Sequence, residues 1–161
     1  KTKNKIKKLE KFDVVDLNSG NHDFQINAQK KSTFFMIGAQ KSRINKNKYK
    51  PYYFNFLDDI KSKNLWGGQI ISRPYEGENI TLVLFDLKSG FKFEDKGHAN
   101  EQITWLIKGN MNFYVKNNKK SLTSNSGVSI GPNQIHGGKS KGALGFDAFF
   151  PKRKEKNYRK N

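Results

Sequence analysis

Residues 90–109, GFKFEDKGHANEQITWLIKG, decide how we interpret this chain. A charged turn that contains glycine carries His98 and Gln102, and the apolar run 103–107 follows at once. A short apolar run bounded by turn residues is typical of a buried strand. A second histidine, His136, ends the similar stretch IGPNQIH. Two polar turns of this kind, each beside a strand, are how a small β-barrel forms a ligand site at its mouth.

The composition limits the classes of protein that fit. A length of 161 residues predicts one domain with a real core, and 13 Phe predict that this core is rich in aromatic rings. No apolar run approaches the roughly 20 residues of a membrane helix, so we expect no membrane segment. The chain has no cysteine, which excludes disulfides and thiolate metal sites. That absence fits a reducing compartment, so we expect a cytoplasmic protein.

The formal charge of +17 raises the question of a nucleic-acid partner. Residues 1–50 hold 13 Lys and Arg against 4 acids, and residues 51–161 hold 18 against 10. The positive charge is therefore spread along the chain, and no sequence-specific DNA or RNA motif accompanies it. We interpret the lysines as a solvated surface and do not expect nucleic acid as the partner.

The order of expected elements indicates an all-β domain. We expect a basic N-terminal extension over residues 1–50, partly disordered or packed on the domain or on a partner subunit, with His22 an ordinary surface histidine. The domain itself spans 51–161 and ends in a basic tail. Short strands at regular spacing, with almost no helical periodicity, predict an antiparallel sandwich or barrel. The expected strands are 12–17, 33–37, 65–73, 80–87, 103–107, 111–115, 128–130 and 143–150, with a short helix at 57–63 and turns or loops at 89–90, 109–110, 117–120 and 137–142.

Three side chains are candidate metal ligands. His98 and Gln102 lie four residues apart across a turn into a strand, and His136 comes from another strand. Imidazole nitrogens together with a carbonyl oxygen can hold a divalent metal ion when rigid elements present them. Isolated histidines are more often surface or core residues, so spacing alone leaves both interpretations open.

Three short motifs support the interpretation that these side chains bind a metal ion. The first comprises Gly90, Lys96, His98, Glu101, Gln102 and Gly109; the second Leu122, Asn125, Ile130, Pro132, Asn133 and His136; the closing one Asp147, Phe149, Pro151 and Arg153. Over about residues 53–153 these resemble the motifs of single-domain cupins. The resemblance is closest to the KdgF-like group, which acts on unsaturated uronates in pectin degradation. It implies a cupin-type jelly-roll antiparallel β-barrel, and often a homodimer.

The resemblance also implies a divalent metal ion held by His98, Gln102 and His136. One family ligand is missing, because Lys96 stands where the group has its first histidine. An ammonium group beside a metal ion repels it. Lys96 therefore turns outward, or ligates with a lowered pKa, or takes the place of the metal and binds an anionic substrate directly. All three outcomes are open at this point.

The closing motif implies the remaining roles. Asp147 would transfer a proton, Arg153 would pair with a substrate carboxylate, and Phe149 would form a wall of the pocket. The plainer alternatives are that Asp147 accepts hydrogen bonds from a loop and that Phe149 is a core residue. The implied reaction is the conversion of a 4,5-unsaturated monouronate to its linear keto form. Two alternatives are a non-catalytic cupin that binds a small molecule and another metal-dependent cupin lyase or dioxygenase.

Overall fold

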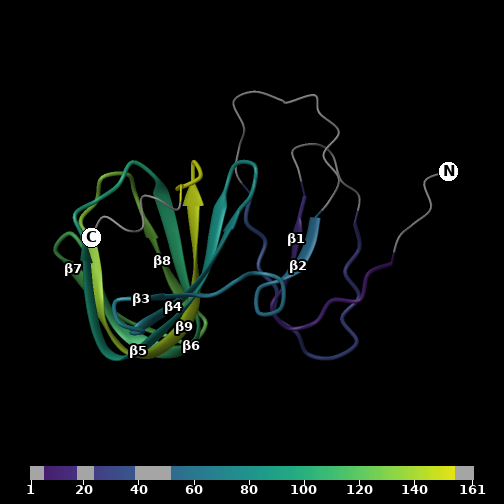
Figure 1. The fold of residues 1–161 in the computed structure, drawn as a ribbon, viewed down its shortest axis with the longest axis horizontal. Helices are drawn as coiled ribbons and strands as arrows, with labels where there is room; N and C mark the ends of the chain where they lie inside the picture. The colour runs from purple at the N-terminus through teal and green to yellow at the C-terminus, as the bar shows by residue number, and fades with distance from the viewer. Residues whose placement is uncertain (1–5, 18–23, 39–51, 155–161) are drawn as a thin grey trace.

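The structure is a computed structural model that describes residues 6–17, 24–38 and 52–154. Every pairing in it is antiparallel, and the described residues form no helix. A two-stranded sheet stands beside a seven-stranded sheet of order β3-β4-β5-β9-β6-β7, with β8 paired to β6 (Figure 1). The strands are β1 (Asp13–Asp16), β2 (Tyr52–Asn55), β3 (Lys63–Leu65), β4 (Ile70–Glu76), β5 (Thr81–Asp95), β6 (Glu101–Val115), β7 (Asn118–Thr123), β8 (Ser126–Ile130) and β9 (His136–Phe150). The predicted all-β jelly-roll architecture is confirmed.

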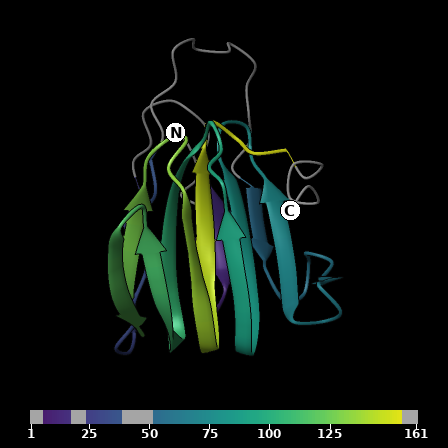
Figure 2. The ribbon, with the colours of Figure 1, turned by 90° about the vertical axis from the view of Figure 1, so that its left-hand side faces the viewer.

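Three long strands give the barrel its shape. Strands β5, β6 and β9 have 15 residues each and bend at mid-length, so that the sheet forms a trough with two sides (Figure 1). We call one side the covered limb: residues 81–87, 101–107 and 143–150. The other is the open limb: residues 91–95, 111–115 and 136–141. The N-terminal strands β1 and β2 lie against the covered limb, and the open limb faces away from them (Figures 1 and 2).

Glycines make the bends. Gly90, Gly109 and Gly142 have φ values of +89°, +83° and +92°, a region that L side chains rarely adopt. A Cβ at Gly109 would lie 1.9 Å from the carbonyl oxygen of Gly142. The pairing register shifts at the bends in β5 and β6, as at β-bulges, so pairing continues through them. The predicted turns at 89–90 and 109–110 and the predicted loop at 137–142 are therefore wrong: these residues lie inside strands.

Two clusters of apolar side chains stabilise this arrangement. The first fills the trough and includes Phe85, Leu106, Met111, Phe113 and Ile130. The second lies between the paired strands β1 and β2 and the outer face of the covered limb. Its members are Phe54, Phe56 and Leu84, with Phe12, Val14, Ile60, Tyr75, Leu82, Ile107 and Leu144 against them. Phe12 and Val14 of the predicted N-terminal extension thus pack against apolar residues of the barrel.

The segment 24–38 also reaches the covered limb. The ring of Phe35 meets the rings of Trp105 and Phe146 edge-on, with centroids 4.7 Å and 5.2 Å away. Trp105 on β6 and Phe146 on β9 are register partners, so one aromatic side chain contacts both strands. The predicted strand at 33–37 is wrong, because these residues pair with no strand in the structure.

Several smaller expectations have clear outcomes. The predicted strand at 12–17 is confirmed as β1, whereas residues 57–63 form a turn that runs into β3 instead of a helix. Pro74 lies inside β4 and not beyond its end. It is tolerated because β3 pairs only with residues 70–72, so no strand of the described residues pairs with β4 at Pro74 on that edge. The expectations for His22 and for much of both tails fall outside the described residues. Within the described residues, no helix exists that could cross a membrane.

Candidate active site

The candidate site lies where the two limbs meet at the mouth of the trough. Asp95 ends β5 on the open limb and is the register partner of His136, which begins β9. Gln102 lies near the start of β6 on the covered limb, opposite Phe149. His98 lies in the turn that joins β5 to β6. The long bent strands therefore bring residues that are far apart in sequence to one rim.

Asp95, His98 and His136 form a possible metal triad. Each offers one ligand atom, and these atoms all lie within 4.8 Å of one another. The two imidazole rings face each other at right angles with centroids 5.4 Å apart. Two histidines and one carboxylate are a donor set that suits ferrous iron, manganese or zinc. The expectation that His98 and His136 converge agrees with this geometry, although their role as ligands stays a prediction.

The hydrogen bonds of the two histidines favour metal binding. His136 Nδ1 lies 2.9 Å from the carbonyl oxygen of Gln134, which fixes Nδ1 as the donor and leaves Nε2 as a bare acceptor. His98 Nε2 lies 3.0 Å from Gln102 Oε1, and His98 Nδ1 is buried with no hydrogen-bond partner. Burial, and next the charge of Arg153, lower the pKa of His98, so the neutral ring that a metal requires is favoured.

Gln102 connects this triad to Asp147. The Gln102 amide nitrogen donates to Thr104 Oγ1 at 2.9 Å and to Asp147 Oδ1 at 3.1 Å, and Thr104 Oγ1 donates to Asp147 Oδ1 at 2.6 Å. Burial raises the pKa of Asp147 to about 6, against the opposing effect of these donors and of Arg153. A carboxyl group with a pKa near neutrality can take up and release a proton under working conditions.

Arg153 comes into the mouth from beyond the end of β9. Its carbonyl oxygen accepts a hydrogen bond from Thr81 at 3.0 Å, and its guanidinium lies over the ring of Phe149 and 3.2 Å from Asp95 Oδ2. The side chains of this ion pair are only 9% and 13% exposed. Burial by itself would raise the pKa of Asp95, but the Gly97 N–H and the Arg153 charge outweigh it and hold the pKa below its usual range.

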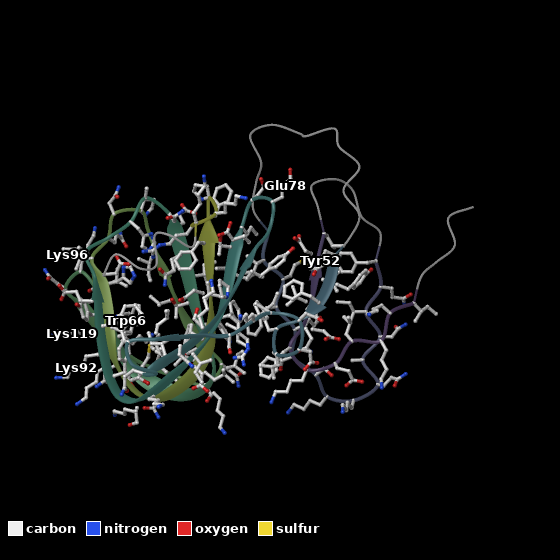
Figure 3. All side chains as sticks on the ribbon, viewed as in Figure 1. Tyr52, Trp66, Glu78, Lys92, Lys96 and Lys119 are labelled. Atoms are coloured by element: carbon white, nitrogen blue, oxygen red, sulfur yellow. The ribbon has the colours of Figure 1, made fainter. Side chains whose placement is uncertain are left out.

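Asp95 and Thr104 are the site residues that sequence reasoning missed. Lys96, at the position of the missing family histidine, is exposed and points away from the barrel, as the label on the left of Figure 3 shows. Successive residues at a strand end point to opposite sides, so an outward Lys96 puts Asp95 inward. The acid directly before Lys96 was the available signal. The substrate-binding role expected for Lys96 stays a prediction.

A cavity of about 150 Å³ extends into the barrel from Asp95 and His136 of the triad. Polar side chains line one part of it and apolar ones the rest. The polar lining comprises Ser72, Glu94, Asp95, Gln102, Thr104, His136, Asp147 and Arg153. Phe149 forms part of the wall and is also a core residue, since it is 2% exposed. Gln102 and His136 of the predicted metal set thus border the same space as Asp147, Phe149 and Arg153 of the closing motif.

The donor set fits a divalent metal ion. Asp95, His98 and His136 would hold it, with the Gln102 oxygen beside His98 as a further donor. The buried Nδ1 of His98 is a polar atom that protein contacts alone leave unsatisfied. A metal ion in this place would supply Lewis-acid chemistry to a ligand in the cavity.

Comparison with known proteins identifies the fold. No protein-family model and no curated protein matches the sequence. Among solved structures, an RmlC-like cupin from Shewanella frigidimarina is 20% identical, with a TM-score of 0.58 over 65% of this chain and 94% of the other. KdgF from Halomonas sp. is 16% identical, with a TM-score of 0.55 over 60% and 92%. HppE, solved with Fe(II), is 9% identical, with a TM-score of 0.52 over 58% and 57%. This chain has the cupin fold.

Proposed function

We propose that this protein is a metal-dependent cupin enzyme that acts on a small anionic sugar acid. The observation that carries the proposal is the hydrogen-bonded chain from His98 through Gln102 to Asp147. It connects the candidate metal ligands to a carboxyl group whose pKa, raised by burial, lies at about 6. The cavity of about 150 Å³ is smaller than the roughly 300–1,000 Å³ of typical drug-sized ligand sites, which favours a monosaccharide over a polymer.

The reaction we propose is the conversion of a 4,5-unsaturated monouronate to its linear keto form. The hemiacetal bond between C1 and the ring oxygen breaks, the C1 hydroxyl gives up its proton as C1 becomes an aldehyde, and C4 takes up a proton as C5 becomes a ketone, so the composition of the substrate does not change. Asp147 moves this proton, and the fold shared with KdgF makes this substrate class the first to test. A bound divalent metal ion would polarise the substrate oxygens.

Arg153 holds the substrate in this proposal. A guanidinium group binds a carboxylate through two parallel hydrogen bonds, and Arg153 already lies beside the carboxylate of Asp95. A substrate carboxylate that pairs with Arg153 releases Asp95 toward the metal position. Binding of the substrate and binding of the metal then strengthen each other, because the substrate carboxylate takes Arg153 and the metal takes Asp95.

The test is the loss of absorbance of a 4,5-unsaturated galacturonate on addition of protein loaded with a divalent metal ion. We expect turnover by the wild type, loss of turnover in Asp147→Asn, and a raised KM in Arg153→Lys. The exposed residue Lys30 offers a control, and Lys30→Gln should be unaffected. Binding of the uronate without turnover would instead support a non-catalytic small-molecule-binding cupin.

A second candidate follows from the triad itself. Two histidines and one carboxylate with open positions are typical of non-haem Fe(II) oxygenases, and HppE with Fe(II) shares the fold. The substrate would again be a small acid, since Arg153 and the cavity are the same. Oxygen consumption decides between the candidates: proton transfer proceeds under nitrogen, whereas an oxygenase stops.

A further inference from the structure

A second hollow lies on the outer face of the open limb. It measures about 700 Å³, and we call it the outer groove. Its side walls and floor come from four neighbouring strands: Lys92 on β5, Asn112 and Tyr114 on β6, Lys119 and Ser121 on β7, and Lys139 on β9. In Figure 3, Lys92 and Lys119 lie on the side of the barrel away from Tyr52 in β2. Figure 2 looks onto this side, with β1 behind the sheet.

The ring of Tyr114 lies across β9 and forms the floor of the outer groove. Glu94 and Tyr114 are both register partners of Gly137, so the three positions form one row across the sheet. The Tyr114 hydroxyl donates to Glu94 Oε2 at 2.8 Å, which spans this row. A Cβ at Gly137 would lie 2.7 Å from the Tyr114 hydroxyl oxygen and 2.4 Å from the Phe93 carbonyl oxygen. The bare glycine therefore lets the ring lie flat and gives the groove its depth.

The lysines of the outer groove have no anionic partner among the described residues. Lys92 and Lys139 are direct register partners on adjacent antiparallel strands, an arrangement in which like charges repel. The described part of the chain contains no ion pair that involves Lys92, Lys119 or Lys139. Glu94 is the one carboxylate in the lining, and Tyr114 binds it. An anion in the groove would relieve this repulsion.

The mixture of groups indicates which anion fits. The ring of Tyr114 offers an apolar face, while Asn112, Ser121 and Glu94 offer donors and acceptors suited to hydroxyl groups. Lysines supply point charges for carboxylates. A chain of phosphates fits less well, because the lining contains no arginine and because Phe93 and Phe113 belong to the core, which leaves the ring of Tyr114 for base stacking. We propose that the outer groove binds an acidic oligosaccharide whose sugar rings carry carboxylates.

This site is separate from the proposed reaction. The cavity at the mouth is too small for an oligosaccharide. Phe93, Glu94 and Phe113 border both hollows, but the other side chains of the outer groove border it alone: Lys92, Asn112, Tyr114, Lys119, Ser121 and Lys139. Successive residues Glu94 and Asp95 illustrate the separation, because Glu94 bonds Tyr114 outside and Asp95 bonds Arg153 inside. The proposal therefore does not depend on the enzyme being active.

Calorimetric titration of the full chain tests the outer groove. The probes are a tetrasaccharide of 1,4-linked hexuronates, the same tetrasaccharide with its carboxyl groups reduced to alcohols, and an eight-nucleotide oligothymidylate. We expect the acidic tetrasaccharide to bind and the neutral one to bind at least about tenfold more weakly. The double variant Lys92→Gln/Lys139→Gln should lose at least about tenfold in affinity, and Tyr114→Ala a similar amount.

The controls locate the binding. Lys30→Gln/Lys31→Gln removes the same charge from an exposed segment outside the groove and should bind like the wild type. His136→Ala changes the mouth of the barrel and should also leave tetrasaccharide binding unchanged. Equal binding of the neutral tetrasaccharide, equal losses in both double lysine variants, or binding of the oligothymidylate alone would each overturn the proposal.

Discussion

The covered limb and the open limb consist of the same three strands, yet their outer faces differ in chemistry. On the covered limb, Trp105 and Phe146 point outward and pack against Phe35. On the open limb, Tyr114 and Lys139 occupy outward positions and lie at the surface of a groove. Both limbs point apolar side chains inward, so the shared core fixes the fold while the outer faces are free to diverge. One face has become an intramolecular interface and the other a surface for ligands.

The two limbs meet at both ends of the trough. The backbone connects them at one end, and polar side chains bring them together at the other. At the bottom, glycines with positive φ bend β5, β6 and β9. At the mouth, Asp95 and His136 of the open limb come together with Gln102 and Asp147 of the covered limb.

The largest effect is expected at the mouth, where the covered limb contributes Asp147. Asp147→Asn keeps the size of the side chain and its ability to accept from Thr104, but it cannot carry a proton. We expect the rate of uronate conversion to fall by about 10²–10⁴-fold, the usual contribution of a general acid or base. Steady-state kinetics measures it. Activity within a factor of two of the wild type would remove Asp147 from the mechanism.

The next effect is expected at the bend. Gly109→Ala places a Cβ 1.9 Å from the backbone oxygen of Gly142 and also strains a positive φ. We expect the free energy of unfolding to fall by about 3 kcal/mol or more. Gly90→Ala is the matched control, because its φ is also positive but nothing lies within 4 Å of its Cβ position. It should lose only about 1 kcal/mol. Urea unfolding that gives equal losses would refute a tightly packed bend.

A pH dependence of stability is expected from the same carboxyl group. Burial raises the pKa of Asp147 from 3.8 to about 6, so the folded state holds this proton more tightly than the unfolded state. The favourable contribution of protonated Asp147 to the free energy of unfolding is complete below about pH 4 and is lost as the pH rises to about 6. Above that, the charged form costs roughly 2–3 kcal/mol.

Asp147→Asn should therefore be more stable than the wild type at pH 8, with the difference vanishing near pH 4. Urea unfolding of chelator-treated protein at both pH values measures this. Asp86→Asn, which changes an exposed carboxyl on β5, serves as the control and should be nearly neutral at both. A variant that is equally destabilised at pH 4 and pH 8 would show that Asp147 is not penalised by burial.

The smallest effect is expected in segment 24–38, where Phe35 packs on the covered limb. Phe35→Ala removes two edge-on ring contacts with Trp105 and Phe146 from a side chain that is still 43% exposed. We expect a loss of about 1 kcal/mol in the free energy of unfolding. Phe34, its 63% exposed neighbour, offers the control, and Phe34→Ala should be close to neutral. If both variants behave alike, segment 24–38 does not stabilise the covered limb.

The sequence predicted the fold class because alternating apolar residues and regular turn signals act locally. It mispredicted the continuity of the long strands for the same reason. Gly90, Gly109 and Gly142 carry the residue type of a turn, and only pairing across the sheet turns them into bends. The packing of Phe35 on Trp105 and Phe146 joins residues about 70 and 110 positions apart, which no local pattern encodes.

The site was predictable where a residue carries a motif and unpredictable where it depends on orientation. His98, Gln102 and His136 follow from the motif pattern, and the structure brings them to one rim. Asp95 belongs to no motif position. It enters the site because Lys96 faces outward and because β5 continues to the mouth, and both facts are set by tertiary pairing.

The most direct test of this account is a metal titration of chelator-treated protein, read by calorimetry with manganese, zinc and anaerobic ferrous iron. The account predicts one divalent ion per chain, bound through Asp95, His98 and His136. Affinity should fall by at least about tenfold in Asp95→Asn and be lost in His136→Ala, while Lys96→Gln, which changes an exposed neighbour, stays near the wild type. No binding by the wild type, or binding that survives both His136→Ala and Asp95→Asn, would contradict it.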